Sequence, residues 1–194
     1  MHLLVLGATG PSGLAFLKEA LHADHNLTIY ARNPSKLPRN IANNPNVQII
    51  QGTFDDVAAV RRSLRTGATV LVSFAGPKLP DRGTVSPSPK TPQPQHPLQQ
   101  QMMMMMLMMN AKPVSEFYEK TLFPMIQNDT ETSLKRCLCC STPSFRWRED
   151  RRSLKWWFLV LGVKLLGGSA YDEVNGIGRV VSRLSDGMEW TVFR

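Results

Sequence analysis

The sequence predicts an α/β fold, a doubly wound parallel sheet that forms a single domain. Strand and helix patterns alternate over the first 76 residues, and the expected strands are apolar along their whole length. Such strands suit a parallel sheet that helices cover on both faces, with right-handed crossovers between the strands. The chain has 194 residues, of which 42% are hydrophobic and 20% charged. This composition favours a globular domain with its own core over a disordered chain.

Hydrophobic periodicity gives the expected elements in order. The first part of the chain should form a strand, a helix, two strands, a helix and a strand: His2–Leu6, Ser12–Ala23, Leu27–Ala31, Val47–Ile50, Asp55–Arg65 and Ala68–Phe74. The last part should form a helix, a strand, a long helical region and a final strand: Val114–Gln127, Lys135–Ser141, Arg151–Leu184 and Glu189–Phe193. The long helical region should break at Gly167–Gly168.

A segment of low complexity separates these two parts. Pro77–Pro97 holds seven of the 14 prolines, and the runs Gln93–Gln101 and Met102–Met109 follow. Proline removes backbone donors, and this composition cannot bury enough surface to offset the entropy of ordering. We therefore expect a disordered Pro/Gln/Met-rich insertion at 79–112. A functional lid and an imperfectly predicted coding sequence are the alternatives.

Three glycines follow the first strand directly and open the first helix. Gly7, Gly10 and Gly13 would let the chain turn sharply, a pyrophosphate approach the backbone and the helix pack on the sheet. The helix N-terminus then offers its N–H groups to phosphates, and Pro11 and Ser12 suit the first helical positions. This context predicts a Rossmann-type dinucleotide-binding unit, with the spacing G-x-x-G-x-x-G in place of G-x-G-x-x-G.

A basic residue follows the second strand. Enzymes that select NAD place Asp or Glu at this point, about 20 residues beyond the glycines, to bind the ribose hydroxyls. Here the residue is Arg32, with Lys36 four positions on. A guanidinium can hold a 2′-phosphate through two hydrogen bonds, whereas a carboxylate would repel it. The sequence therefore predicts NADP(H) in preference to NAD(H).

Several segments resemble the NmrA-like atypical short-chain dehydrogenase/reductases. They are Gly7–Gly13, Ala31–Pro34 and Ser73–Pro77, together with Leu138–Ser144 and Trp190–Arg194, which are similar to the fifth and sixth strands of that group. The resemblance implies a Rossmann fold with strand order 3-2-1-4-5-6 in one NAD(P)-binding domain, 1–194, interrupted by 79–112. That group includes NADP(H)-dependent reductases of small molecules and cofactor-binding proteins without known turnover.

The resemblance also implies where the cofactor contacts the chain. Thr9, Gly10, Pro11 and Ser12 would line the diphosphate, in the turn that Gly7 and Gly13 open. Arg32, near Lys36, would bind the 2′-phosphate, and Thr53 and Phe54 would lie beside the adenine. Ala75 and Gly76 would lie along the cofactor, and Ser141, Thr142 and Pro143 near the nicotinamide.

Two departures bear on catalysis. Members of the group commonly carry an acidic residue after the glycine of the third strand, where Thr53 follows Gly52. The Tyr-x-x-x-Lys signature, whose lysine lowers the tyrosine pKa so that the phenol can exchange a proton, has Asn175 at the lysine position after Tyr171. Tyr171 is therefore expected to be a partly buried structural residue, and no catalytic residue is assigned.

No metal site is expected. Cys137 and Cys139 face one side of a strand and Cys140 the other, so they cannot converge as zinc ligands. The three are expected to be small apolar residues, and they do not describe a disulfide framework. A cytoplasmic, reducing location follows as the default.

Charge and hydropathy indicate neither a nucleic-acid site nor a membrane partner. The formal net charge is +8, and much of the excess lies in one helix entry: Arg146, Arg148, Arg151, Arg152 and Lys155. A solvated basic face is the expected interpretation. No stretch approaches the roughly 20 apolar residues of a membrane span, and the short apolar run at the N-terminus is no signal peptide. Trp156–Leu166 could associate with a membrane, but is expected to pack on the sheet.

Two functions fit these observations. The first is an NADPH-dependent oxidoreductase of a small quinone, flavin or carbonyl, for which solvent can supply the proton. The second is a non-catalytic NADP(H)-binding regulator that acts through a protein partner. The absence of Tyr-x-x-x-Lys favours the second function, whereas the cofactor-binding half of the chain suits both. A truncated paralogue of poor function is the third alternative.

Overall fold

The structure, a computed structural model, describes residues 1–76, 113–140, 154–166, 168–183 and 188–193. Six strands form one sheet in the order β3-β2-β1-β4-β5-β6: β1 His2–Leu6, β2 Asn26–Ala31, β3 Val47–Gln51, β4 Val70–Ser73, β5 Arg136–Cys140 and β6 Glu189–Phe193. Every neighbouring pair is parallel, so the predicted topology is confirmed. The expected segments 79–112 and Ser141–Pro143 lie outside the described residues.

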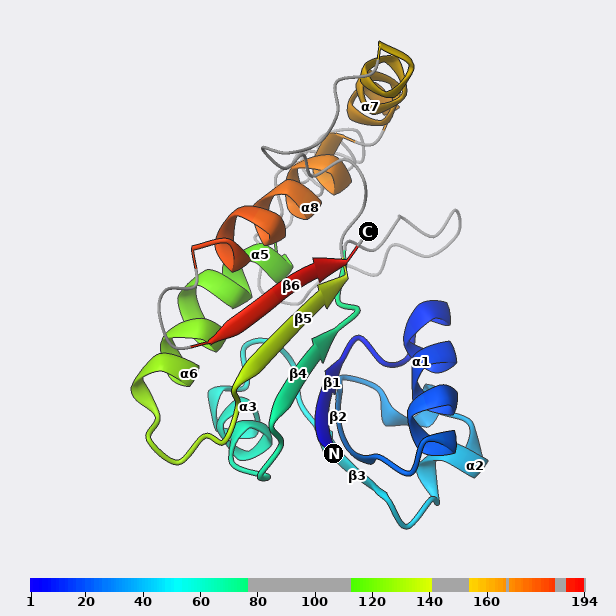
Figure 1. Cartoon of the computed structure of the whole chain (residues 1–194), viewed down its shortest axis with the longest axis vertical. Coiled ribbons are helices and arrows are strands. Elements are labelled where there is room, and N and C mark those ends of the chain that lie inside the picture. Colours follow the sequence, from blue (N-terminus) through cyan, green and yellow to red (C-terminus); the bar gives the residue numbers. More distant parts are fainter. Residues whose placement is uncertain (77–112, 141–153, 167, 184–187, 194) are drawn as a thin grey trace, which may run out of the picture.

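Helices cover both faces of this sheet (Figure 1). One face carries α1 Pro11–His22 and α2 Arg39–Ala42; the other carries α3 Val57–Leu64, α5 Pro113–Phe117, the π-helical turn η2 Tyr118–Leu122, α6 Phe123–Asn128 and α8 Gly168–Val181. A 3-10 turn, η1 Pro34–Lys36, links β2 to α2, and α7 Leu154–Leu166 precedes α8. Two apolar clusters follow from the alternation of side chains along the strands. In β1, Leu3 and Val5 join one cluster, and Leu4 and Leu6 join the other.

Most elements begin and end within two residues of their predicted bounds, but η1 and α2 were not expected. Both lie in the polar stretch between β2 and β3, where α2 buries the single residue Ile41. One buried position in a four-residue helix leaves no periodicity to detect. The N-terminus of α3 is set by Asp56, whose carboxylate accepts a hydrogen bond of 2.9 Å from the Ala59 N–H.

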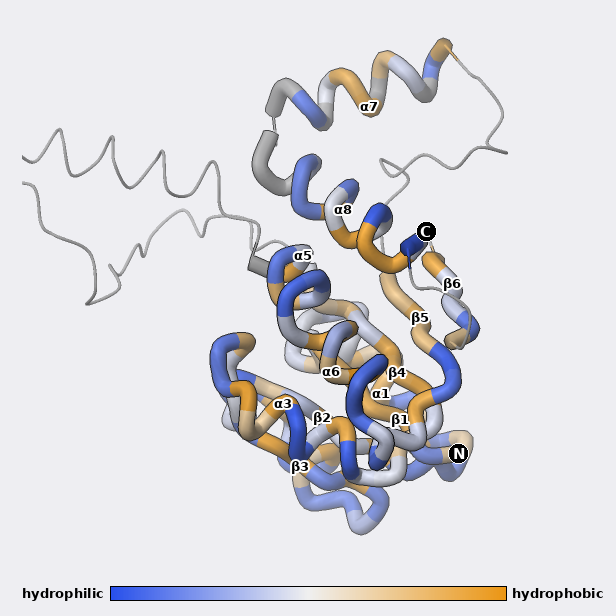
Figure 2. The backbone as a smooth tube through the Cα atoms, turned by 90° about the vertical axis from the view of Figure 1, so that its left-hand side faces the viewer, coloured by the Kyte–Doolittle hydropathy of each residue, from blue (hydrophilic) through white to orange (hydrophobic). Residues whose placement is uncertain are grey.

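The expected packing of the tryptophan-rich helix on the sheet is wrong. α7 lies across the end of α8, farther from the sheet (Figure 2). Its residues Trp157 and Phe158 are exposed. The position on the sheet is occupied by α8, which buries Val174, Ile177 and Val181. The described residues contain no helix long and apolar enough to cross a membrane.

Candidate functional site

The turn between β1 and α1 contains two glycines that pack tightly against neighbouring backbone. Gly7 has a φ of +70°, and a Cβ there would lie 2.5 Å from the Ala75 nitrogen. A Cβ on Gly13 would lie 2.6 Å from the Gly7 carbonyl oxygen. Side chains at either position would collide with backbone, so the turn is pressed against the end of β4. The predicted diphosphate turn and the predicted cofactor contact at Ala75 are thereby neighbours.

Gly10 differs from these two glycines, because a Cβ there would make only an ordinary contact with the described residues. The nearest atom to a Cβ built there is the Gly7 carbonyl oxygen, at an ordinary contact distance of 3.6 Å. Gly10 is the N-cap of the 12-residue helix α1, and no side chain of the described residues caps it. An uncapped N-terminus presents unsatisfied N–H groups and the positive end of the helix dipole. The cradle fits a pyrophosphate group.

Arg32 and Lys36 are both exposed beyond the end of β2. Within the described part of the chain, neither forms an ion pair with a carboxylate. The loop between them is held locally, since the Ser35 hydroxyl donates a hydrogen bond of 2.6 Å to the Asn33 side-chain oxygen. The two cations are therefore available to a ligand with a negative group at this edge of the sheet.

The β3 loop is fixed by Tyr30. Its hydroxyl donates a hydrogen bond of 2.6 Å to the Thr53 carbonyl oxygen. The phenol lies directly beneath Gly52, where a Cβ would collide with it and with Ala59. Burial, followed by the nearby Asp56 carboxylate, raises the pKa of Tyr30 to about 12, so the phenol stays a protonated donor. Sequence reasoning did not identify this role.

Phe54 has a neighbour that the sequence did not predict. Its ring stacks on that of Phe117, with centroids 4.3 Å apart and planes inclined by 14°. One face of Phe54 is thus covered by α5, and the residue as a whole is half-buried. Any adenine contact would use the other face or the edge of the ring.

A buried polar pair lies behind Ala75. The Ser73 hydroxyl is hydrogen-bonded to the Tyr118 hydroxyl, and it accepts a bond of 3.2 Å from the Ala75 N–H. Tyr118 is 1% exposed, and its burial raises its pKa well above the ordinary value. Tyr118 lies in the π-helical turn, a feature that often occurs at functional sites. The pair holds the end of β4, which lies against Gly7.

Cys137 and Cys139 lie on the same side of β5, as the alternation along a strand predicts. Cys137 and Cys139 are buried on one side of β5 with their sulfurs 3.6 Å apart, whereas Cys140 is half-buried. In the described residues no group of three His, Cys, Asp or Glu side chains could hold a metal ion.

Two residues of α8, one of them at the lysine position of the Tyr-x-x-x-Lys pattern, have structural roles. Asn175, at the lysine position, donates a side-chain hydrogen bond of 2.8 Å to the Tyr171 carbonyl oxygen. Glu173 is buried and accepts bonds from the Val114 N–H at 2.5 Å and the Ser115 N–H at 3.2 Å. It therefore caps α5 and joins it to α8, a structural role that no local pattern in the sequence indicated.

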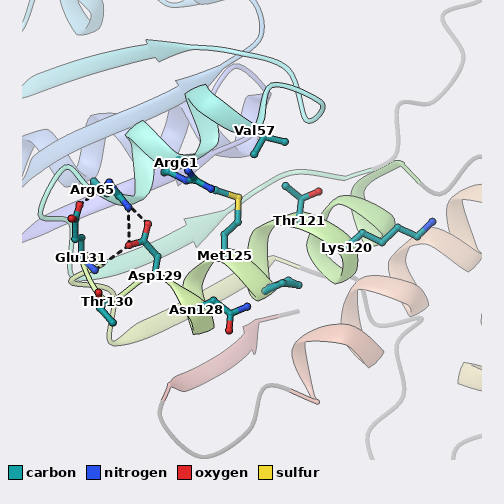
Figure 3. Close-up of a pocket in the computed structure, with 11 residues that line it drawn as sticks. Val57, Arg61, Arg65, Lys120, Thr121, Met125, Asn128, Asp129, Thr130 and Glu131 are labelled. Atoms are coloured by element: carbon teal, nitrogen blue, oxygen red, sulfur yellow. Dashed lines mark hydrogen bonds and ion pairs between the residues drawn. The ribbon is translucent and has the colours of Figure 1, made fainter.

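A surface hollow of about 550 Å³ lies elsewhere, between α3 and α6 (Figure 3). Arg65 on its rim forms ion pairs with Asp129 at 2.9 Å and Glu131 at 2.7 Å. None of the residues expected to contact a cofactor lines this hollow. The candidate site is instead the edge formed by the carboxyl ends of β1, β2, β3 and β4.

The sequence matches a family model described as NAD(P)H-binding over residues 7–118. No curated protein matches the chain.

Similar solved structures include several reductases. A short-chain dehydrogenase/reductase from Veillonella parvula, in complex with NADP, is 15% identical with a TM-score of 0.63, covering 100% of this chain and 68% of that one. An anaerobillin reductase from Escherichia coli has the same identity and TM-score and covers 100% and 72%. Gre2 from Candida albicans, in complex with NADPH, is 12% identical with a TM-score of 0.60, covering 99% and 56%. At these identities the likeness shows the fold, and it confirms the expected resemblance at that level.

Proposed function

Because the chain belongs to the NAD(P)H-binding family, we propose that it binds NADP(H) over the carboxyl ends of β1 to β4 and reduces a small molecule. The nicotinamide, when bound, supplies a hydride. The residues of this chain bind and orient the cofactor. One observation carries the proposal. In the β1–α1 turn, a Cβ at Gly7 or Gly13 would collide with the protein backbone, whereas a Cβ at Gly10 would not, so the lack of a side chain at Gly10 leaves room for a ligand.

The pyrophosphate would lie at the N-terminus of α1. The backbone of Thr9 to Gly13 would donate to its oxygens, with the dipole of α1 adding a favourable field. Pro11 lacks an N–H, so the donors are those of the neighbouring residues. The Ser12 hydroxyl, which is exposed, is a further donor.

The 2′-phosphate would lie against Arg32 and Lys36. Both cations are exposed, and the loop that carries them is held by the Asn33–Ser35 hydrogen bond. The 2′-phosphate of NADP(H) would have two positively charged partners here. NAD(H) would find no carboxylate here to accept hydrogen bonds from its ribose hydroxyls. This arrangement favours NADP(H).

The remaining contacts follow from the same orientation. Thr53 and Phe54 would lie beside the adenine, and Ala75 and Gly76 along the cofactor. A side chain at Gly76 would meet no atom of the described residues within 4 Å, so among these residues the position leaves room for a ligand. Ser141, Thr142 and Pro143 would lie near the nicotinamide.

The substrate would be a quinone, flavin or carbonyl compound of low molecular weight. Hydride acceptors of this kind can take their proton from water, so the absence of a Tyr–Lys pair is compatible with turnover. We assign no residue as the acid.

A panel assay tests this function. The full chain is incubated with NADPH and a series of quinones, flavins and aldehydes, and cofactor oxidation is followed by absorbance. We expect oxidation that depends on both protein and acceptor, and that Gly10→Val abolishes. Absence of NADPH binding would contradict the proposal.

One observation favours a second function, a non-catalytic NADP(H)-dependent regulator with a protein partner. The residue at the lysine position, Asn175, is uncharged and bonded to the helix backbone, so it cannot lower the pKa of a catalytic phenol. Tight NADPH binding without oxidation by any acceptor would support this function over the first.

A further inference from the structure

The first turns of α7 expose three large apolar side chains on one face. Leu154, Trp157 and Phe158 are 78%, 55% and 64% exposed. Their spacing of i, i+3 and i+4 places them together on a helix, and the half-buried Leu161 continues the same row. Other exposed large apolar residues of the described chain, such as Met1 and Val57, belong to different elements. We name the set of Leu154, Trp157, Phe158 and Leu161 the α7 face.

The α7 face has no partner among the described residues that could explain it. α7 packs on α8, and the two views show it at the end of the molecule, beyond α8 and away from the sheet (Figures 1 and 2). Trp157 and Phe158 contact each other edge to face, with ring centroids 5.0 Å apart. Rings that remain this exposed cost solvation free energy, which a partner would recover.

Two exposed lysines border the α7 face. At about 100° per residue, Lys155 and Lys164 lie about a quarter-turn to either side of Leu154. Their aliphatic stems can lie along an apolar surface while the ammonium groups reach outward to anionic groups. Leu, Trp and Phe side chains with lysines beside them are among the features of helices that lie in a lipid interface. A 13-residue helix is about 20 Å long, which is too short to span the hydrocarbon core.

We propose that α7 docks on an anionic lipid surface, with the α7 face in the headgroup region and Lys155 and Lys164 on the lipid phosphates. This differs from the expectation that no membrane partner exists, which rested on the lack of a membrane-spanning stretch and on the packing of this helix on the sheet. The positive charge of the chain favours anionic lipid over a second copy of the protein as the occupant of the α7 face. The chain has a formal net charge of +8, which attracts anionic lipid and opposes the pairing of two copies through a lysine-bordered face.

Sedimentation with lipid vesicles tests the proposal. The full chain is mixed with vesicles of phosphatidylcholine alone or with about one-third phosphatidylserine, and the bound fraction is measured at increasing salt. We expect binding to the anionic vesicles, weaker binding to the neutral ones, and release by salt. The double variant Trp157→Ser/Phe158→Ser should bind at least tenfold more weakly, as should Lys155→Gln/Lys164→Gln.

Matched variants control for general effects of charge and hydrophobicity. Lys18→Gln/Lys135→Gln removes the same charge from exposed sites elsewhere, and Val57→Ser removes an exposed apolar side chain. Both should bind the anionic vesicles like wild type, and circular dichroism should show the same fold for every variant.

Three results would overturn the proposal. The first is a wild-type chain that binds neither vesicle. The second is binding that the α7 variants and the controls weaken equally. The third is a wild-type dimer, seen by sedimentation velocity, that the aromatic variant alone dissociates, since a second copy would then occupy the α7 face.

Discussion

The Tyr30 hydroxyl donates to the carbonyl oxygen of Thr53, 23 residues away, across a distance of 2.6 Å. This bond links the end of β2, two residues before Arg32, to the loop after β3. Under the proposed orientation of the cofactor, it joins the 2′-phosphate side of the site to the adenine side. The same phenol fills the space beneath Gly52, which is why no larger residue fits there.

Stability should fall between pH 10 and 12, in part through Tyr30. The pKa of this phenol is raised from 10.0 to about 12 in the folded chain, so the unfolded chain loses the proton first. The stabilisation is complete below pH 10 and disappears as the pH rises through 12. Tyr30→Phe should cost about 1 kcal/mol at neutral pH, because the Thr53 oxygen keeps its bond from the Asp56 N–H.

Urea unfolding of wild type and Tyr30→Phe at neutral pH and from pH 10 to 12 measures both effects. The variant should show a shallower loss of stability in the alkaline range, although Tyr118, whose pKa is also raised, still contributes. Identical alkaline slopes would show that Tyr30 does not titrate as described.

The glycines of the β1–α1 turn should separate folding from binding. Gly10 has an extended backbone, with φ −81° and ψ 165°, and open space around it, so Gly10→Val should fold. Its branched side chain would occupy the space of the pyrophosphate, and cofactor binding should be lost. Gly13→Val would collide with the Gly7 and Ala8 backbone and should cost about 2 kcal/mol or more.

Melting temperature and calorimetric titration with NADPH compare the two glycine variants. Unchanged NADPH affinity in a folded Gly10→Val would refute the placement of the phosphates.

Arg32 should determine the preference between cofactors. Arg32→Asp should weaken NADPH binding by at least tenfold, which is about 1.4 kcal/mol, while leaving NADH binding largely intact. Arg179→Asp changes the charge equally at an exposed site on α8 and should leave the preference unchanged. Fluorescence titration of both variants with both cofactors measures the effect. Equal loss of both affinities in Arg32→Asp would mean that the residue is structural.

Residues 79–112 should be dispensable for folding and for cofactor binding. β4 ends at Ser73 and α5 begins at Pro113, and connections of this kind usually need only a few residues. Loop-closure entropy changes slowly with length, so a short Gly/Ser linker should leave stability unchanged or slightly raised. Thermal unfolding and NADPH titration of the shortened chain test this. A chain that no longer folds would contradict the proposed division at 79–112.

The sequence patterns predicted those features of the fold that depend on residues close together in the chain. Apolar runs gave the six strands, and the glycines at 7, 10 and 13 gave the turn, because sharp turning and close backbone packing depend on nearby residues. The Ser73–Tyr118 and Glu173–Ser115 contacts join residues 45 and 58 positions apart, and no periodicity reports such pairs. The position of α7 was predicted wrongly because hydropathy shows that a helix is apolar without showing which surface covers it.

Calorimetric titration of the wild-type chain with NADPH and with NADH tests the central claim most directly, since the claim is a dinucleotide site with a 2′-phosphate subsite. We expect both to bind at one site per chain, with NADPH binding at least tenfold more tightly because only it can engage Arg32 and Lys36. Equal affinities would contradict the assignment of the 2′-phosphate subsite, and the absence of any binding would contradict the site itself.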